Sequence, residues 1–360
     1  MTALPTNIDR TEHQPRDTDR EGGLMGLAER GWLPDGLVRV GIRRLLKQRL
    51  EEEASRGDQS AALRERLPQG PIAVKTEDAN RQHYEVPADF YAYSLGHRLK
   101  YSGCYWPKGV TTLDDAEHAA LGLACERAEL ADGMDILELG CGWGSLTLWM
   151  AEHYPNAAIT AVSNSASQRA FILERAEQHG LSNINIITAD INEFDTELRF
   201  DRVCSIEMFE HMANHHELLR RVSAWLKDDG KLFVHVFSHA RFTYLFEEAG
   251  RSNWMGRHFF TGGIMPSHGY LPSFDEHLTC EADWVQAGTH YQKTAEAWLD
   301  NTDANRDAIL PLFAETYGQA NASIWLQRWR IFYMACAELW GYAEGKEWGV
   351  SHYRFAKRSY

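Results

Sequence analysis

A dense group of titratable side chains follows a predicted strand in the middle of the chain. After residues 201–206 come Glu207, Glu210 and His211, so two carboxylates lie three residues apart and a histidine adjoins the second one. Side chains of these types can attract a cation and take a proton from it, as general-base catalysis requires. Acidic residues also cap helix N-termini, which would account for one glutamate. Because capping does not account for all three, we predict that Glu207, Glu210 and His211 are catalytic.

Two more histidines lie near the end of the next predicted strand, 231–237. His235 is within this strand and His239 is two residues beyond it. The carboxyl ends of neighbouring parallel strands meet at one edge of a sheet, so we include both histidines among the catalytic candidates. No C-x-x-C pair accompanies them. A zinc site is therefore not supported, and we predict no metal.

The segment that must position these groups is 136–144, which reads Ile-Leu-Glu-Leu-Gly-Cys-Gly-Trp-Gly. An apolar run, alternate glycines and the start of a helical pattern predict a strand, a tight turn and a helix. Glycines let the backbone approach a ligand, and the helix start offers free N–H groups. The spacing is not the G-x-G-x-x-G of dinucleotide sites. Glu138 suits a cationic ligand such as S-adenosylmethionine better than a pyrophosphate; an ordinary glycine turn is the alternative.

Further contacts to a nucleotide-like cofactor are expected after the next two strands. No acidic residue follows the run 158–162, so Ser163 and Gln168 would have to hold the ribose hydroxyls. Farther along, Asp190 offers an acceptor for an adenine amino group, and Ile191 offers an apolar surface for the ring. Each of these residues also has an ordinary alternative role as a helix cap or turn residue.

The surrounding pattern alternates strands with helices. The predicted strands are 134–139, 158–162, 184–188, 201–206, 231–237 and 348–356, and the predicted helices between them include 113–130, 145–153, 165–178 and 215–226. This alternation predicts an α/β fold with a doubly wound, mostly parallel, Rossmann-like sheet. Ligands of such sheets bind outside the carboxyl ends of the strands, which is where the candidate residues lie.

Three regions are predicted along the chain. Residues 1–23 are polar and charged and are predicted to form a flexible arm. Helical spacing interrupted by Pro34 predicts an N-terminal helical region at 24–79, which either caps the site or mediates a dimer. The catalytic domain is predicted at 80–360, with lid and acceptor-binding segments at about 239–345 inserted after the fifth strand.

Composition excludes several kinds of partner. The 360-residue chain carries a formal net charge of −14, so nucleic acid, which needs a basic surface, is not expected. No apolar run is long enough to cross a bilayer, and the N-terminus has no signal-peptide core, so stable membrane insertion is not expected. Six scattered cysteines without a C-x-x-C pair are typical of reduced thiols in a cytoplasmic protein. A homodimer is left open.

Several motifs together resemble a known family. The glycine loop resembles the cofactor loop of class I S-adenosylmethionine methyltransferases. Residues 101–106 (Tyr-Ser-Gly-Cys-Tyr-Trp), 163–168 and 209–211 (Phe-Glu-His) resemble the cyclopropane-fatty-acyl-phospholipid synthase family, which includes plant coclaurine N-methyltransferase. The resemblance covers about residue 80 to the C-terminus. It implies a class I methyltransferase domain that uses S-adenosyl-L-methionine and releases S-adenosyl-L-homocysteine.

The resemblance also implies which residues contact the cofactor. Tyr101 and Ser102 contact it directly, Glu138 and the first glycines line its methionine end, and Gln168 holds its ribose side. The complete predicted set is Tyr101, Ser102, Glu138, Gly140, Gly142, Ser163, Asn164, Gln168, Asp190, Ile191, Asn192 and Ile206.

The two branches of this family differ in their base. By resemblance, cyclopropane synthases bind a bicarbonate through a cysteine, a glutamate, a histidine and a tyrosine. Glu210, His235 and Tyr291 match, but Gly103 stands at the cysteine position. The amine methyltransferases have Glu-x-x-Glu-His, which this chain reproduces from Glu207. They also have a histidine at the position of His239 and an acid at the position of His235.

We therefore predict N-methylation of a small, aromatic or cyclic amine by direct displacement, assisted by the Glu/His cluster. The alternative is cyclopropanation or methylation of unsaturated acyl chains, with bicarbonate bound only in that case. A protein that binds the cofactor without catalysis is a third, weaker reading. Aromatic side chains suit a cationic acceptor, and the predicted acceptor-binding residues are Tyr84, Trp106, Phe237, Tyr291, Trp329 and Phe332.

Overall fold

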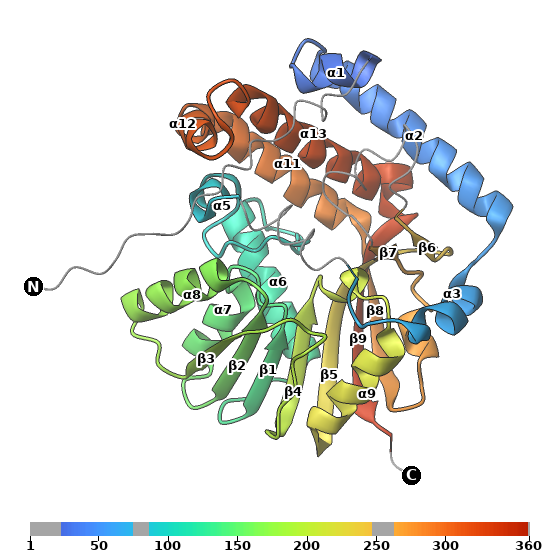
Figure 1. The fold of residues 1–360 in the computed structure, drawn as a ribbon, viewed down its shortest axis with the longest axis vertical. Helices are drawn as coiled ribbons and strands as arrows, with labels where there is room; N and C mark the ends of the chain where they lie inside the picture. The colour runs from blue at the N-terminus through green and yellow to red at the C-terminus, as the bar shows by residue number, and fades with distance from the viewer. Residues whose placement is uncertain (1–22, 75–85, 247–262, 359–360) are drawn as a thin grey trace, which may run out of the picture.

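The computed structural model describes residues 23–74, 86–246 and 263–358. At its centre is a seven-stranded sheet in the order β3-β2-β1-β4-β5-β9-β8 (Figure 1). Every pairing from β3 to β5 is parallel, whereas β9 is antiparallel to both of its neighbours. The strands are β1 Asp135–Leu139, β2 Ala158–Ser163, β3 Ile184–Thr188, β4 Phe200–Ile206, β5 Leu226–His239, β8 Leu278–Ala287 and β9 Trp348–Lys357. The predicted doubly wound, mostly parallel fold is confirmed.

Helices cover both faces of this sheet, as its alternating side chains require. Leu137, Val203 and Leu232 point to the face that α9 covers, while their neighbours Cys204 and Phe233 point to the face that α6 and α7 cover. The helices around the parallel strands are α6 Leu113–Arg127, α7 Ser145–His153, α8 Ala166–Gln178 and α9 His215–Trp225, with a short 3₁₀ turn η3 at Phe209–His211. Two separate apolar cores therefore hold the sheet rigid beneath the site.

A third layer, made of helices, lies across one end of the sheet (Figure 1). Its core contains buried rings such as Trp298, Trp329 and Tyr333. Its helices are α1 Gly23–Glu29, α2 Asp35–Arg56, α5 Ala88–Ser94, α11 Gly288–Ala304, α12 Arg306–Tyr317 and α13 Ala322–Gly341. The break between α1 and α2 is at Pro34, as the sequence predicted. The buried Glu29–Arg328 pair, 3.1 Å apart, ties α1 to α13.

The remaining elements are short. They are α3 Ser60–Arg66, η2 Leu67–Gln69, β6 Tyr244–Leu245, β7 Ile264–Met265, η4 Leu271–Ser273 and η5 Tyr342–Gly345. The predicted arm lies almost wholly outside the described residues, as do Tyr84 and part of the predicted lid. Among the helices that the structure describes, none combines the length and the apolar character that crossing a membrane requires.

Candidate functional site

The glycine loop between β1 and α7 forms the floor of the site. Gly140 and Gly142 have φ angles of 77° and 51°, which glycine adopts far more readily than other residues. The amides of Gly140 and Cys141 both donate to the carbonyl of Val162, at 3.0 and 3.1 Å, so the turn is fixed to the end of β2. A Cβ at Gly140 would come within 2.9 Å of Met208, whereas one at Gly142 would meet nothing within 4 Å. The loop is thus packed against Met208 at Gly140 and has open space beside Gly142.

Two adjoining pockets share this loop and form one cleft at the carboxyl ends of β1, β2 and β4. Both are lined by Gly140, Gly142, Gln168, Met208 and His211. Ten of the twelve predicted cofactor residues line the cleft: Tyr101, Ser102, Glu138, Gly140, Gly142, Ser163, Asn164, Gln168, Ile191 and Ile206. This matches the general position of ligands in open α/β sheets.

The other two predicted cofactor residues are engaged beside the cleft. The Asp190 carboxylate accepts a hydrogen bond from the backbone N–H of Asn192 at 2.8 Å. The Asn192 side chain accepts from the Ala73 N–H at 3.0 Å and donates to the Ala73 carbonyl at 3.1 Å. Asn192 thereby fastens the segment that contributes Ala73 and Val74 to the pocket wall. Its side chain acts on the cleft through that segment.

Buried polar atoms in the cleft fit a ligand with hydroxyl and charged groups. Ser163 Oγ donates to Gln168 Oε1 at 2.6 Å, which leaves Gln168 Nε2 buried with no partner among the described residues. Ser145 Oγ is buried in the same way. Since a buried polar group without a partner is costly, these atoms suit a bound nucleoside or amino-acid group. The residues present therefore fit S-adenosylmethionine, with Gln168 on its ribose and Glu138 toward its ammonium.

Glu138 is buried at the end of β1, where Thr147 Oγ1 donates to its Oε2. Burial raises the pKa of Glu138 to about 7. A cationic ligand would favour the ionised carboxylate and lower this pKa. Below pH 7 the ligand must therefore displace a proton when it binds, whereas above pH 7 it need not.

We accordingly expect the affinity for S-adenosylhomocysteine to be constant above about pH 7 and to fall by up to about tenfold per pH unit below it. Calorimetric titrations from pH 5.5 to 8.5 would measure this dependence. Glu138→Gln is the matched control, and it should bind more weakly with a flatter profile. A wild-type affinity that does not change across this range would exclude a proton-linked role for Glu138.

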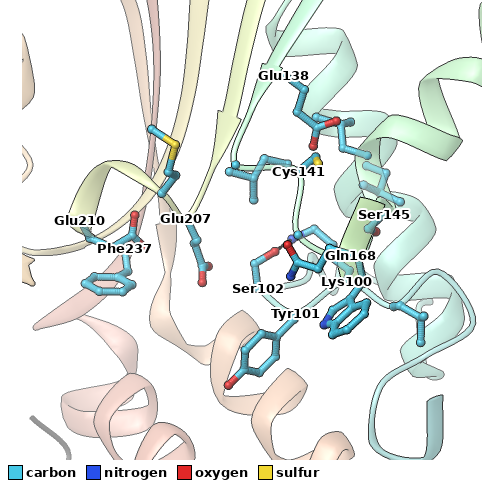
Figure 2. Close-up of a pocket in the computed structure, with 18 of the residues that line it drawn as sticks. Lys100, Tyr101, Ser102, Glu138, Cys141, Ser145, Gln168, Glu207, Glu210 and Phe237 are labelled. Atoms are coloured by element: carbon cyan, nitrogen blue, oxygen red, sulfur yellow. Dashed lines mark hydrogen bonds between the residues drawn. The ribbon is translucent and has the colours of Figure 1, made fainter. Parts of the chain in front are cut away.

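Glu207 lies at the centre of the cleft, directly after β4 (Figure 2). Its backbone has a φ of 46°, unusual for a residue with a side chain. Three donors surround its carboxylate: the Gly103 N–H at 2.9 Å, the Tyr291 hydroxyl at 2.8 Å and His235 Nε2 at 3.2 Å. Burial raises the pKa of Glu207, while the Lys100 charge and these Gly103 and Tyr291 hydrogen bonds lower it. The side chain is held in one place by groups that favour its ionised form.

Glu210 lies on the same wall of the pocket but in a different environment. It is 1% exposed, and neither carboxylate oxygen has a partner among the described residues. Burial, together with the charge of Glu207, raises the pKa of Glu210 well above its usual value. The surroundings raise the pKa of both carboxyl groups, but among the described residues only Glu207 has donors that favour its ionised form, so a proton shared by the pair is held preferentially by Glu210.

The three predicted histidines occupy different positions. His211 lines the cleft beside the glycine loop. His235 lies beneath the cleft and contacts it through Glu207. His239 is fully buried away from the lining residues, where its Nδ1 accepts from the amides of Arg241 and Phe242 at 2.9 and 3.0 Å. This histidine holds the turn that follows β5.

Aromatic side chains close the cleft on the side of the helical layer. Phe237, Tyr291 and Phe332 line it, and Tyr291 is stacked on Trp340 with ring centres 4.7 Å apart. The other described members of the predicted acceptor set are one layer back. Trp106 donates from its indole to Thr294 Oγ1 at 2.9 Å, and Trp329 is buried in the core of the helical layer.

Sequence reasoning did not identify Lys100, which is 2% exposed and lines the cleft. Its Nζ donates to Ser102 Oγ at 2.6 Å and to the Gly103 carbonyl at 2.7 Å. The backbone N–H groups of Arg98 and of Lys100 itself donate to the buried Glu117 carboxylate, at 2.7 and 3.1 Å. A lysine directly before the Tyr-Ser motif was the available signal. By bonding to the Gly103 carbonyl, Lys100 positions the segment whose Gly103 N–H donates to Glu207. Trp143, Ser145 and Trp298 also line the cleft without having been predicted.

Comparisons with known proteins agree with this geometry. A family model described as mycolic acid cyclopropane synthetase matches residues 73–342. The chain is 38% identical to (S)-coclaurine N-methyltransferase of Thalictrum flavum subsp. glaucum over 347 residues, 93% of this chain and 95% of that protein. It is 29% identical to the cyclopropane-fatty-acyl-phospholipid synthase of Escherichia coli K12, covering 66% of this chain and 59% of that one.

A solved structure of coclaurine N-methyltransferase, bound to N-methylheliamine and S-adenosylhomocysteine, superposes with a TM-score of 0.88. The two chains are 37% identical, and the match covers 93% of this chain and 99% of that one. At this level of identity and coverage, the similarity extends from the sheet to the helical layer that closes the cleft.

Proposed function

The chain belongs to the mycolic acid cyclopropane synthetase family and is an S-adenosylmethionine-dependent methyltransferase; from this premise we propose that it methylates the nitrogen of a small cyclic or aromatic amine. The pair of buried carboxylates in the cleft supports this proposal most directly, because Glu207 is fixed by several donors and Glu210 has no partner among the described residues. A buried carboxylate without a partner suits a cation that arrives with the substrate.

The two glutamates have complementary tasks in this proposal. Bound S-adenosylmethionine supplies the methyl group on a sulfonium. Glu207 attracts the ammonium form of the amine. As the ammonium enters, its charge favours the ionised form of Glu210, which releases its proton to the solvent. Glu210 then accepts a proton from the ammonium and leaves a neutral nitrogen whose lone pair can attack the methyl carbon. The N–C bond would form as the bond between the methyl carbon and the cofactor sulfur breaks, and Glu207 would lie beside the positive charge that the nitrogen gains.

The surrounding side chains favour an amine with an aromatic or cyclic body. Phe237, Tyr291 and Phe332 present ring surfaces to the same cleft. Such surfaces bind both an apolar ring system and a cation close to it. Excluding water from the reacting atoms strengthens the attraction between Glu207 and the cation. Positioning of this kind supplies much of the acceleration in a direct displacement.

The alternative, transfer to an unsaturated acyl chain, fits the site less well. The family's bicarbonate site would need a side chain at Gly103, but a Cβ there would come within 2.8 Å of the Tyr291 ring. The nearby Cys104 is 1% exposed, and burial raises the pKa of its thiol to about 12. Tyr291 and His235 already direct their donors at Glu207. The Glu207 carboxylate thus accepts the hydrogen bonds that Tyr291 and His235 could otherwise donate to a bound bicarbonate.

A mass-spectrometric screen tests the proposal directly. The purified protein and S-adenosylmethionine are incubated with a pool of secondary and tertiary amines, including tetrahydroisoquinolines, and separately with vesicles of unsaturated phospholipids. The expected result is a mass gain of one methylene unit on an amine and none on lipid. A gain on acyl chains alone would establish the alternative. A cofactor that binds without turnover on either pool would exclude both.

We also expect the protein to act in the cytoplasm. All six cysteines are free thiols in the structure, and five of them are buried. An oxidising compartment would expose such thiols to modification during folding. Fractionation of the native host, followed by immunodetection, would test this placement.

A further inference from the structure

Beneath Glu207, a line of hydrogen bonds crosses three elements of the fold. His235 Nε2 is 3.2 Å from Glu207 Oε1, His352 Nε2 is 2.8 Å from His235 Nδ1, and an Arg127 guanidinium nitrogen is 2.8 Å from His352 Nδ1. His235 on β5 and His352 on β9 are paired directly across the two strands. Both rings are buried, with exposures of 3% and 1%. Arg127 comes from the last turn of α6.

The arginine sets the direction of the whole line. A guanidinium only donates, so His352 Nδ1 must accept and its proton must be on Nε2. His352 Nε2–H then donates to His235 Nδ1, and the His235 proton is on Nε2, from which it donates to Glu207. Every hydrogen bond points toward the carboxylate. Each imidazole is neutral and confined to one tautomer.

The surroundings of the two rings favour these neutral forms. Burial lowers the pKa of His235 well below its usual value, and the Lys100 and Arg127 charges act in the same direction. Burial likewise lowers the pKa of His352 well below its usual value, and the neighbouring His235 and Arg127 act in the same direction. Arg127 is held over the ring of Trp284, 4.9 Å from its centre. Trp284 on β8 is in turn paired with His352, so the outer end of the line is fixed as well.

We propose that His352 and Arg127 are positioning residues that orient His235 as a permanent donor to Glu207. This inference rests on the proposed function of the Glu207 site. A proton on Glu207 could not leave along the line, since His235 Nε2 already carries one. The line therefore holds Glu207 as the fixed anion, and the exchange of protons with the amine falls to Glu210.

Nitrogen NMR of protein labelled with ¹⁵N-histidine tests the orientation without any turnover. In the wild type, His235 and His352 should both show the neutral tautomer protonated on Nε2, in the free protein and with S-adenosylhomocysteine bound. Finding either ring protonated on Nδ1, or charged at neutral pH, would overturn the proposal. This readout does not depend on the identity of the methyl acceptor.

Variants separate orientation from packing. His352→Gln retains one acceptor and one donor, His352→Leu removes both, and Arg127→Met removes the outer donor. We expect His352→Leu and Arg127→Met to release the His235 ring from its single tautomer and to lower kcat by about tenfold, with KM for the amine little changed. His352→Gln should keep kcat within about threefold of the wild type.

His268→Gln is the matched control, because His268 also bonds through both ring nitrogens, to Ser351 and Asp283, outside the cleft. It should leave kcat and the His235 signal unchanged. If His352→Leu does not fold, Arg127→Met and His352→Gln are compared instead, and we expect a lower kcat and a changed His235 tautomer in Arg127→Met only. Equal kcat values and an unchanged His235 tautomer in all variants would mean that the line is structural only. If no acceptor is turned over, the proposed function fails while the tautomer measurement still stands.

Discussion

Replacing Glu207 with glutamine is expected to lower kcat by about three orders of magnitude while S-adenosylhomocysteine still binds. The change removes the charge that attracts the ammonium. It also places an amide NH₂ among the Gly103 N–H, the Tyr291 hydroxyl and His235 Nε2–H, which all donate to the carboxylate. At least one buried donor then loses its acceptor. Initial rates with an amine found in the screen, together with calorimetry for the cofactor product, would measure both effects.

Two companion variants sharpen this test. Glu207→Asp keeps the charge but withdraws it by one methylene, so it should retain more activity than Glu207→Gln. Glu207→Gly leaves the donors of His235 and Tyr291 without an acceptor, and added formate or bicarbonate should restore part of kcat. Activity of Glu207→Gln within about tenfold of the wild type would contradict the assigned role of this carboxylate.

Substituting Gly140 by alanine should weaken cofactor binding by about a hundredfold or more. The residue has a φ of 77°, and an added Cβ would come within 2.9 Å of the Met208 side chain. The loop must shift, which displaces the amide that is fixed to the Val162 carbonyl and moves the floor of the cleft. Misplacement of binding groups by an ångström carries a large cost. Calorimetric titration with S-adenosylhomocysteine would report the loss.

Gly133→Ala is the matched control for backbone strain. Gly133 has a similar φ of 82°, but an added Cβ there would meet no atom within 4 Å, and the residue does not line the cleft. It should cost about 1 kcal/mol of folding stability and leave cofactor affinity unchanged. Equal affinities in the two variants would show that the crowding at Gly140 does not matter for binding.

The parallel part of the fold could be predicted because its signals are local. The strands β1, β2 and β4 are each followed by turn and helix patterns, and the observed bounds of β1 to β4 differ from the predicted ones by a residue at most. The strand β8 was not predicted. Its exposed side chains alternate with buried or half-buried ones, and polar residues such as Thr279 and Glu281 interrupt its apolar ones. An edge strand of this kind gains its stability from pairing with β9, which the sequence alone does not reveal.

The candidate site likewise contains residues that local sequence signals predict and residues that only tertiary contacts bring together. Glu207, Glu210 and the glycine loop follow strand ends directly, so a rule about strand ends was enough to bring them together. Hydrogen bonds link Lys100 and His352 to Glu207 through Gly103 and His235, and tertiary packing brings these two residues to the carboxylate. The Asn192 side chain was predicted to face the cofactor, but the structure directs it to the backbone of Ala73. Its position after a strand end predicted that Asn192 lies near the cleft, but it did not predict which group its side-chain amide bonds.

The place of β9 in the sheet bears on how the protein is made. β5 pairs with β9 from Lys231 to His239, although more than a hundred residues separate the two strands in the chain. During synthesis, β5 leaves the ribosome long before its partner, so its mostly apolar segment 232–237 has an unpaired backbone edge exposed. Such an edge invites association between nascent chains. Because β9 also carries His352, the step that protects this edge is the same one that completes the hydrogen-bond line to Glu207. Chains that stop short of β9 would therefore be both inactive and prone to aggregate.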